Sequence, residues 1–420
     1  MFDYIFETKS ATLLAAAAAT WLAFLLVGNP RAWWRSLLFN YGPAFACAFF
    51  VVGNFYSGEV SGFDLLAGFL FEFSVLIASA KFFCDALKRV ASGYDGASEH
   101  WLRWSLVLQL LAAAPLVAID GAGIFSDGSR IAYFHDSSIA RYLAYAGVLT
   151  AYVQAGLLAQ RLSAGRSPGA TGYAVVVAAF VTSTLSGSKG GVFLWLIATL
   201  ALVDYRHIRI RWAPVLVALI AATAALWVTA SVISETLGIS ELEFANMAVA
   251  RFYLNNDARA LAIDLGGQAA PFSDLVAASF RGLANLLGNP SNDPPLGLLL
   301  NERQTGLDTG NGPNASLIAL IAYYSIRGYA LLPALVSCVG VACVYAAVTG
   351  FRRIVRCKLS KMAASLIGIV LVQLLSQDFL AFPLGVVSAC AAGLLFLVID
   401  RKYARASTRR PAPPARLAAP

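Results

Sequence analysis

Apolar runs of about 17 to 25 residues recur along almost the whole chain, and they constrain its fold more than any other feature. A helix of that length crosses the hydrocarbon core of a bilayer, which is about 30 Å thick. Only helices and closed barrels span lipid, and these runs lack the alternation of barrel strands. Hydrophobic residues make up 59% of the chain and charged residues 13%, which excludes a soluble enzyme. The sequence therefore predicts an all-α, polytopic transmembrane helical bundle.

About 11 to 12 spans are expected. A shorter apolar stretch, 315–325, predicts either a further crossing or a helix at the surface. The other predicted spans are residues 11–28, 37–53, 63–84, 105–120, 141–160, 171–186, 192–204, 213–234, 328–349, 363–377 and 384–399.

Lysine and arginine clusters predict the orientation, because positively charged short loops stay on the cytoplasmic side. Such clusters lie at 205–212, at 351–358 and in the C-terminal tail. The net charge of +8 is spread over loops and tail, so topology explains it better than nucleic-acid binding. The N-terminus is then outside and the C-terminus inside. The predicted divisions are spans 1–8 in 1–234, a periplasmic loop in 235–313, C-terminal spans in 314–400 and a disordered basic tail in 401–420.

The periplasmic loop contains one clear amphipathic pattern between Pro271 and Pro290. Ser273 is placed to cap a helix, and Gly288 and Pro290 would stop it. Such a helix would lie along the membrane or pack on the bundle. Its expected apolar stripe is Val276, Phe280, Leu283 and Leu287.

Upstream in the same loop, Arg251, Asn255 and Arg259 recur at intervals of four, which on a helix forms one stripe of donors. Two guanidinium groups beside a membrane suit a phosphate-bearing ligand. The alternative is that they form ion pairs within the loop, with Asp257, Asp264 or the acidic cluster Glu235, Glu241 and Glu243.

Two further polar segments adjoin predicted spans. In the turn 183–191, Lys189 stands next to Gly190, an arrangement that suits an anion but also describes a tight hairpin. The approach to 315–325 carries Asp308, Asn311 and Asn314. Asn314 could cap the following helix, whose N-terminus attracts anions.

These segments resemble the bacterial O-antigen polymerase and O-antigen ligase superfamily over about residues 170 to 350. SGSKGGVFLWLIATLAL resembles its [ST]-G-S-[RK]-G-G turn, a long outer loop precedes the late spans, and GPNASLIALIAYYSIRGYALL resembles its H-N-x-x-L-x-x-x-x-x-x-G-x-x-G segment. The family's basic residue maps to Lys189 and its Asn to Asn314. Pro313 stands where ligases commonly have histidine, which favours a polymerase.

The resemblance implies a metal-independent membrane glycosyltransferase without cofactors, in the bacterial inner membrane. It would polymerise undecaprenyl-pyrophosphate-linked oligosaccharide repeat units into O-antigen, capsule or exopolysaccharide on the periplasmic face. Partners would be that substrate and the lipid bilayer, with a chain-length regulator as a further candidate and no nucleic acid. The expected catalytic residues are Lys189, Arg251, Arg303, Asp308 and Asp257, and the expected substrate-binding residues are Arg259, Asn255, Asn311, Asn314 and Gly190.

Two alternatives remain open. An O-antigen ligase would transfer the glycan to a different acceptor from the same kind of donor. A lipid-linked oligosaccharide flippase or other transporter would be expected to show internal repeats or charges at mid-membrane. The main charges inside predicted spans are Glu72 and Lys81, which do not form an obvious pair.

Overall fold

The computed structural model describes the chain in segments, and every element in them is helical. The described residues are 2–52, 61–92, 94, 96–120, 138–185, 191–207, 220, 227, 231, 240, 242, 258–259, 261–263, 265, 272–286, 296–305, 314–325 and 331–408.

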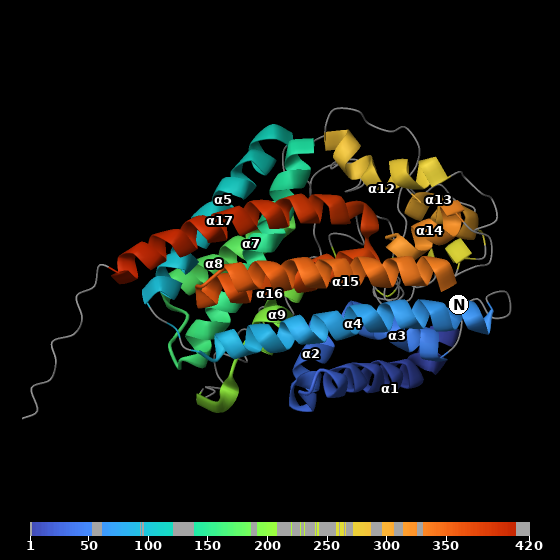
Figure 1. Cartoon of the computed structure of the whole chain (residues 1–420), viewed down its shortest axis with the longest axis horizontal. Coiled ribbons are helices and arrows are strands. Elements are labelled where there is room, and N and C mark those ends of the chain that lie inside the picture. Colours follow the sequence, from blue (N-terminus) through green and yellow to red (C-terminus); the bar gives the residue numbers. More distant parts are fainter. Residues whose placement is uncertain are drawn as a thin grey trace, which may run out of the picture.

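The elements follow one another along the chain with few long gaps (Figure 1). They are α1 (Phe2–Leu26), η1 (Pro30–Ala32), α2 (Trp33–Phe39), α3 (Tyr41–Val52), α4 (Gly62–Val90), α5 (Gly96–Asp120), α7 (Ser138–Ser163), α8 (Gly169–Leu185), α9 (Gly191–Leu202), η3 (Tyr205–His207), α12 (Phe272–Leu286), α13 (Leu296–Thr305), α14 (Leu317–Ser325), α15 (Leu331–Ile354), α16 (Lys358–Gln377), η4 (Phe379–Ala381) and α17 (Phe382–Thr408).

Among the described residues, four helices are long and apolar enough to cross a membrane: Gly62–Val90, Leu331–Ile354, Lys358–Gln377 and Phe379–Arg401. They run side by side in Figure 1, and α16 packs against α4, α15 and α17. The most apolar window of α16 is 78% buried, against 33% for that of α15. The protein is therefore a helical membrane protein with α16 at its centre.

Local sequence explains where the central helices begin. The Ser61 hydroxyl accepts a hydrogen bond from the backbone N–H of Asp64 at 3.1 Å, which caps the start of α4. Asp400 of α17 reaches across to the start of α16, where its carboxylate accepts from the N–H of Cys357 at 3.1 Å and from the Ser360 hydroxyl at 2.7 Å. A carboxylate is stabilised there by the free amides and the positive end of the helix dipole.

The predicted spans correspond closely to helices, and residues 213–234 lie almost entirely outside the described residues. Within the stretch 315–325, the described helix α14 runs from Leu317 to Ser325. Ile318, Ala319 and Leu320 are fully buried, so this part of the stretch packs against protein and does not lie exposed at the surface. The helix α17 continues to Thr408, so the start of the predicted disordered tail is helical.

The predicted amphipathic helix of the long loop is α12, but its start differs from expectation. It begins at Phe272, so Ser273 lies in its first turn, where its hydroxyl donates to Asp274 at 3.1 Å instead of capping the helix. Val276 and Phe280, from the expected packing stripe, are exposed, whereas Leu275 is buried. The outward apolar face suits contact with lipid or with a neighbouring surface.

Candidate functional site

An ion pair lies inside the bundle, between Glu72 of α4 and Arg259 of the connection between α9 and α12. The Nη2 atom of Arg259 is 2.8 Å from the carboxylate of Glu72, and the two side chains are 2% and 0% exposed. Glu72 has no obvious partner in the sequence, and in the fold it pairs with Arg259. The acidic residues considered as partners of Arg259 lie outside the described residues. A buried charge in a membrane bundle usually has such a partner.

Two serines complete the network around this ion pair. The Ser376 hydroxyl of α16 donates to the second carboxylate oxygen of Glu72 at 2.6 Å, and Arg259 also donates to the backbone carbonyl of Ser376. The Nε of Arg259 lies 3.2 Å from the hydroxyl of Ser316, just before α14. Hydrogen bonds of this kind offset the cost of removing both charges from water. Arg259 thus connects the long loop to three helices.

Segments of the long loop form an apolar cluster beside the ion pair, separate from the main core of the bundle. Ala258 and Ala262 pack with α12, α13 and α14, which lie together at one end of Figure 1. Of the predicted site residues on these helices, Arg303 is exposed near the end of α13, and Asn314 is exposed shortly before α14. Their neighbours Leu300 and Ala315 belong to the cluster, so both polar side chains extend from one packed unit.

The remaining predicted site residues lie outside the described residues. They are Lys189, Gly190, Arg251, Asn255, Asp257, Asp308 and Asn311. Their roles therefore stay predictions.

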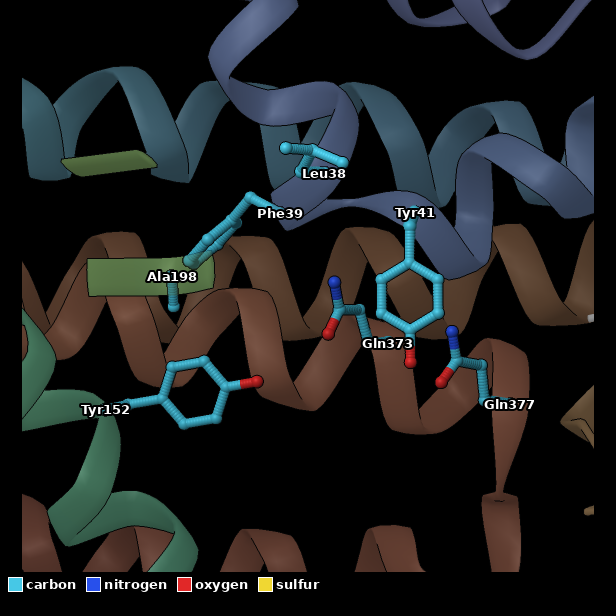
Figure 2. A pocket seen from close by; sticks show the side chains of 7 residues that line it. All are labelled: Leu38, Phe39, Tyr41, Tyr152, Ala198, Gln373 and Gln377. Carbon is cyan, nitrogen blue, oxygen red and sulfur yellow. The ribbon is translucent and has the colours of Figure 1, made fainter. Parts of the chain in front are cut away.

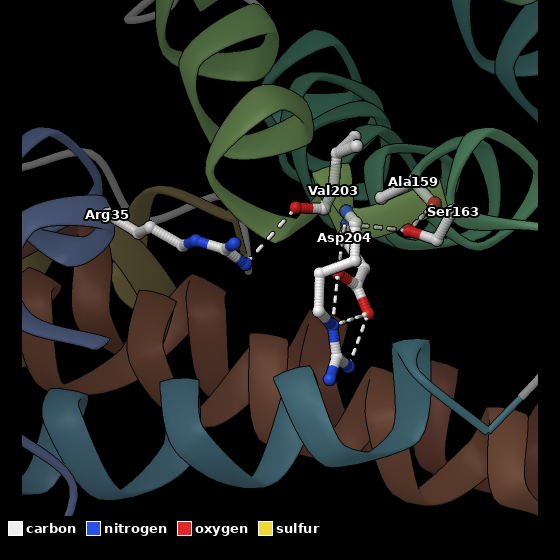
Figure 3. Close-up of polar contacts among 6 residues, drawn as sticks. Arg35, Ala159, Ser163, Val203 and Asp204 are labelled. Atoms are coloured by element: carbon white, nitrogen blue, oxygen red, sulfur yellow. Dashed lines mark hydrogen bonds and ion pairs between the residues drawn. The ribbon is translucent and has the colours of Figure 1, made fainter. Parts of the chain in front are cut away.

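Basic and acidic side chains form a separate set of contacts where the chain passes from α9 to η3 (Figure 3). This region lies at the end of the bundle opposite α12, α13 and α14 in Figure 1. Arg35 donates to the carbonyl of Val203 at 3.2 Å, just past the end of α9. The N–H of Asp204 donates to the Ser163 hydroxyl at 2.8 Å. Hydrogen bonds from Arg206 lower the pKa of Asp204 to about 2. These contacts hold loops together.

A second polar cluster at that end joins α5 to α7. The Tyr94 hydroxyl donates to Glu99 at 2.6 Å, and Arg161 forms an ion pair with the same carboxylate. The hydrogen bond from Tyr94 is the main factor that lowers the pKa of Glu99, with a further contribution from Arg161. Glu99 is therefore a structural carboxylate that stays charged at neutral pH.

No group of three potential metal-ligating side chains gathers anywhere in the described part of the chain. The six cysteines are all free thiols. The described site is thus built from arginine, glutamate, serine and amide groups.

Together, the apolar helices and the buried ion pair define a polytopic helical membrane protein with a polar centre. No family model, curated protein or solved structure matches the chain.

Proposed function

We propose that the protein is a membrane glycosyltransferase that polymerises undecaprenyl-pyrophosphate-linked oligosaccharide repeat units into a surface polysaccharide. One observation supports this most. The contact of 3.2 Å between Arg259 and Ser316 joins two segments that are 57 residues apart in the sequence. One carries the predicted arginine stripe, and the other carries the motif around Asn314. A site made from both segments requires such a contact.

The proposed reaction is a glycosyl transfer between two lipid-linked molecules. A hydroxyl of the acceptor attacks the anomeric carbon of the donor, the bond from that carbon to the pyrophosphate oxygen breaks, and the hydroxyl proton passes to a base. The leaving pyrophosphate gains negative charge, and fixed cations that stabilise developing charge are often the largest contribution to catalysis. Asp257 and Asp308 remain the candidate bases.

The described residues suggest a division of roles. Arg303 and Asn314 are exposed and free to meet a ligand from outside the bundle. Arg259 is engaged with Glu72 and two serines, so we assign it a positioning role for the loop that carries Arg251 and Asp257. This changes its proposed role from substrate-binding to positioning.

The test is the length distribution of lipid-linked and surface glycan in cells that produce the Arg303→Ala or Asn314→Ala variant. Both residues are exposed, so their loss should leave the amount of protein in the membrane unchanged. We expect glycan ladders to collapse to single repeats. The matched control is Arg353→Ala, which removes an exposed arginine from the last turn of α15, at the predicted cytoplasmic end, and should leave the ladders unchanged.

Other outcomes separate the alternatives. Normal ladders in both variants would contradict the site. Full-length polymer that stays on its lipid carrier would indicate a ligase. The loss of every surface repeat, with single repeats retained on the cytoplasmic side, would indicate a flippase.

A further inference from the structure

A small cavity lies inside the bundle where α2, α3, α7, α9 and α16 meet (Figure 2). Its polar lining consists of Tyr41, Tyr152, Gln373 and Gln377, and apolar side chains of α2 and α9 complete the wall. The two glutamines are four residues apart on α16, so they lie on one face of that helix. Figure 2 shows both phenol groups and both amides facing the same space.

The size of the cavity limits what it can hold. Its volume of about 30 Å³ is enough for one or two water molecules or hydroxyl groups. A complete sugar ring would not fit, but one edge of a ring would. The site is therefore suited to the hydroxyls at the edge of a larger ligand.

The chemistry of the lining selects among ligand classes. Phenol and carboxamide groups can each donate and accept hydrogen bonds, and none of the described residues that line the cavity is charged. A phosphate would find no cation there, and a metal ion would find no carboxylate, imidazole or thiolate. An acyl chain would bring no hydrogen-bonding group to this polar lining, and polar groups buried against hydrocarbon are costly. Neutral hydroxyl groups match this lining.

Two neighbouring residues indicate that the polar site is built into the packing. Gly42 follows Tyr41, and a Cβ there would lie 1.6 Å from the amide nitrogen of Gln377, so a larger residue would displace this amide from its position. Asn40 lies between the lining residues Phe39 and Tyr41. Within the described part of the chain, both polar atoms of its side chain are buried without a hydrogen-bond partner. A group in that state costs about 1–3 kcal/mol unless a water or ligand bonds to it.

The cavity is next to the candidate site described above. Ser376, which bonds Glu72 and Arg259, lies between Gln373 and Gln377 in the same turn of α16. One helical turn therefore supports both the ion pair and the cavity.

We propose that this cavity binds hydroxyl groups of a neutral sugar, as part of the saccharide of the lipid-linked substrate. The proposal rests on the proposed function for the identity of that saccharide. The geometry itself requires only a neutral, hydroxyl-bearing ligand.

The test is direct binding to the purified full-length protein in lipid nanodiscs. The probes are methyl glycosides of common neutral hexoses and of N-acetylglucosamine, and saturation-transfer NMR measures their binding. Inorganic phosphate is the charged comparison. We expect sugar binding to the unaltered protein, a loss of tenfold or more in Gln373→Leu and Gln377→Leu, and a loss of about three- to tenfold in Tyr41→Phe and Tyr152→Phe. Phosphate should not compete with the sugars.

The matched control is Gln154→Leu. It removes a buried amide two residues from Tyr152 that bonds Gln109 at 2.8 Å and does not line the cavity. Sugar binding should survive in this variant. If no glycoside binds the unaltered protein, or if Gln373→Leu and Gln377→Leu bind as well as Gln154→Leu, the cavity holds water alone and the proposal is wrong. Competition by phosphate would also overturn it.

The two proposals can fail separately. Unchanged ladders in Arg303→Ala and Asn314→Ala, together with sugar binding that depends on Gln373, would leave a sugar site in a protein of another function. Collapsed ladders with cavity-independent sugar binding would leave the polymerase without this subsite.

Discussion

At the scale of single residues, the buried pair of Glu72 and Arg259 is the most consequential contact in the structure. Moving either charge out of water costs several kcal/mol, and the partner together with the hydroxyls of Ser376 and Ser316 offsets that cost. The ion pair is therefore stable only while both charges are present. Loss of one member leaves the other charge buried without its partner.

This asymmetry leads to a prediction about stability. Glu72→Leu and Arg259→Met should each destabilise the protein by about 3–5 kcal/mol, whereas the double variant should cost less than either single change. The measurement is unfolding of purified protein in detergent, with the exposed Arg303→Ala as a control that changes little. Additive losses in the double variant would show that the two charges do not depend on each other.

The sequence could indicate one half of this site and not the other. Glu72 is an isolated carboxylate within a long apolar run, which marks it as functional or paired. Arg259 stood out through its spacing from Arg251 and Asn255. Nothing in the sequence connects the two, because spacing shows only neighbours on one element, and this contact depends on how α4, α14 and α16 pack. Ser316 and Ser376 carry no signal at all without that packing.

At the scale of elements, two central helices, α4 and α16, pack together where a glycine meets an aromatic ring. A Cβ at Gly368 of α16 would lie 2.8 Å from the ring of Phe82 on α4. The Phe82 ring is fully buried and lies 5.2 Å, between centroids, from the ring of Tyr345 on α15. The ring therefore has little room to move, and glycine at this position lets α4 and α16 approach.

We expect Gly368→Ala to destabilise the protein by about 1–3 kcal/mol through overpacking, less a gain of up to about 1 kcal/mol in helix propensity. The matched control is Gly350→Ala in α15, where nothing lies within 4 Å of the new methyl group. That variant should be neutral or slightly stabilised. Thermal unfolding of both proteins in the same detergent checks the expectation, and equal behaviour would show that the contact with Phe82 adapts freely.

Hydropathy predicted most elements because each span must be apolar over its whole length, whatever surrounds it. Hydropathy was less informative for apolar helices that are covered by protein instead of lipid. The stretch 315–325 was predicted to be a further span or a surface helix, and its described part, α14, is covered by protein around Ile318 and Leu320. In α12, the stripe containing Val276 and Phe280 is apolar but faces outward. An apolar stripe does not reveal whether its neighbour is protein or lipid.

At the scale of the whole molecule, the basic loops predicted to be cytoplasmic are linked to one another at one end. Arg35 bonds the carbonyl of Val203, Ser163 bonds the N–H of Asp204, and Gln160 donates to the carbonyl of Arg89 at 3.3 Å. Arg352 forms an ion pair with Asp85, which joins the last turn of α15 to the C-terminal part of α4. The cluster of α12, α13 and α14 lies at the other end (Figure 1). The charge pattern is thus consistent with a single orientation of the bundle.

That orientation can be tested with single cysteines in a variant whose six native cysteines are replaced by alanine or serine. Ser273→Cys on α12 and Arg353→Cys on α15 both place a thiol at an exposed position, near opposite ends of the bundle. We expect a membrane-impermeant maleimide to label residue 273 in intact spheroplasts and residue 353 only after lysis, because short loops rich in arginine and lysine stay in the cytoplasm. The reverse pattern would put Arg303 and Asn314 on the cytoplasmic side, where the proposed periplasmic reaction could not occur.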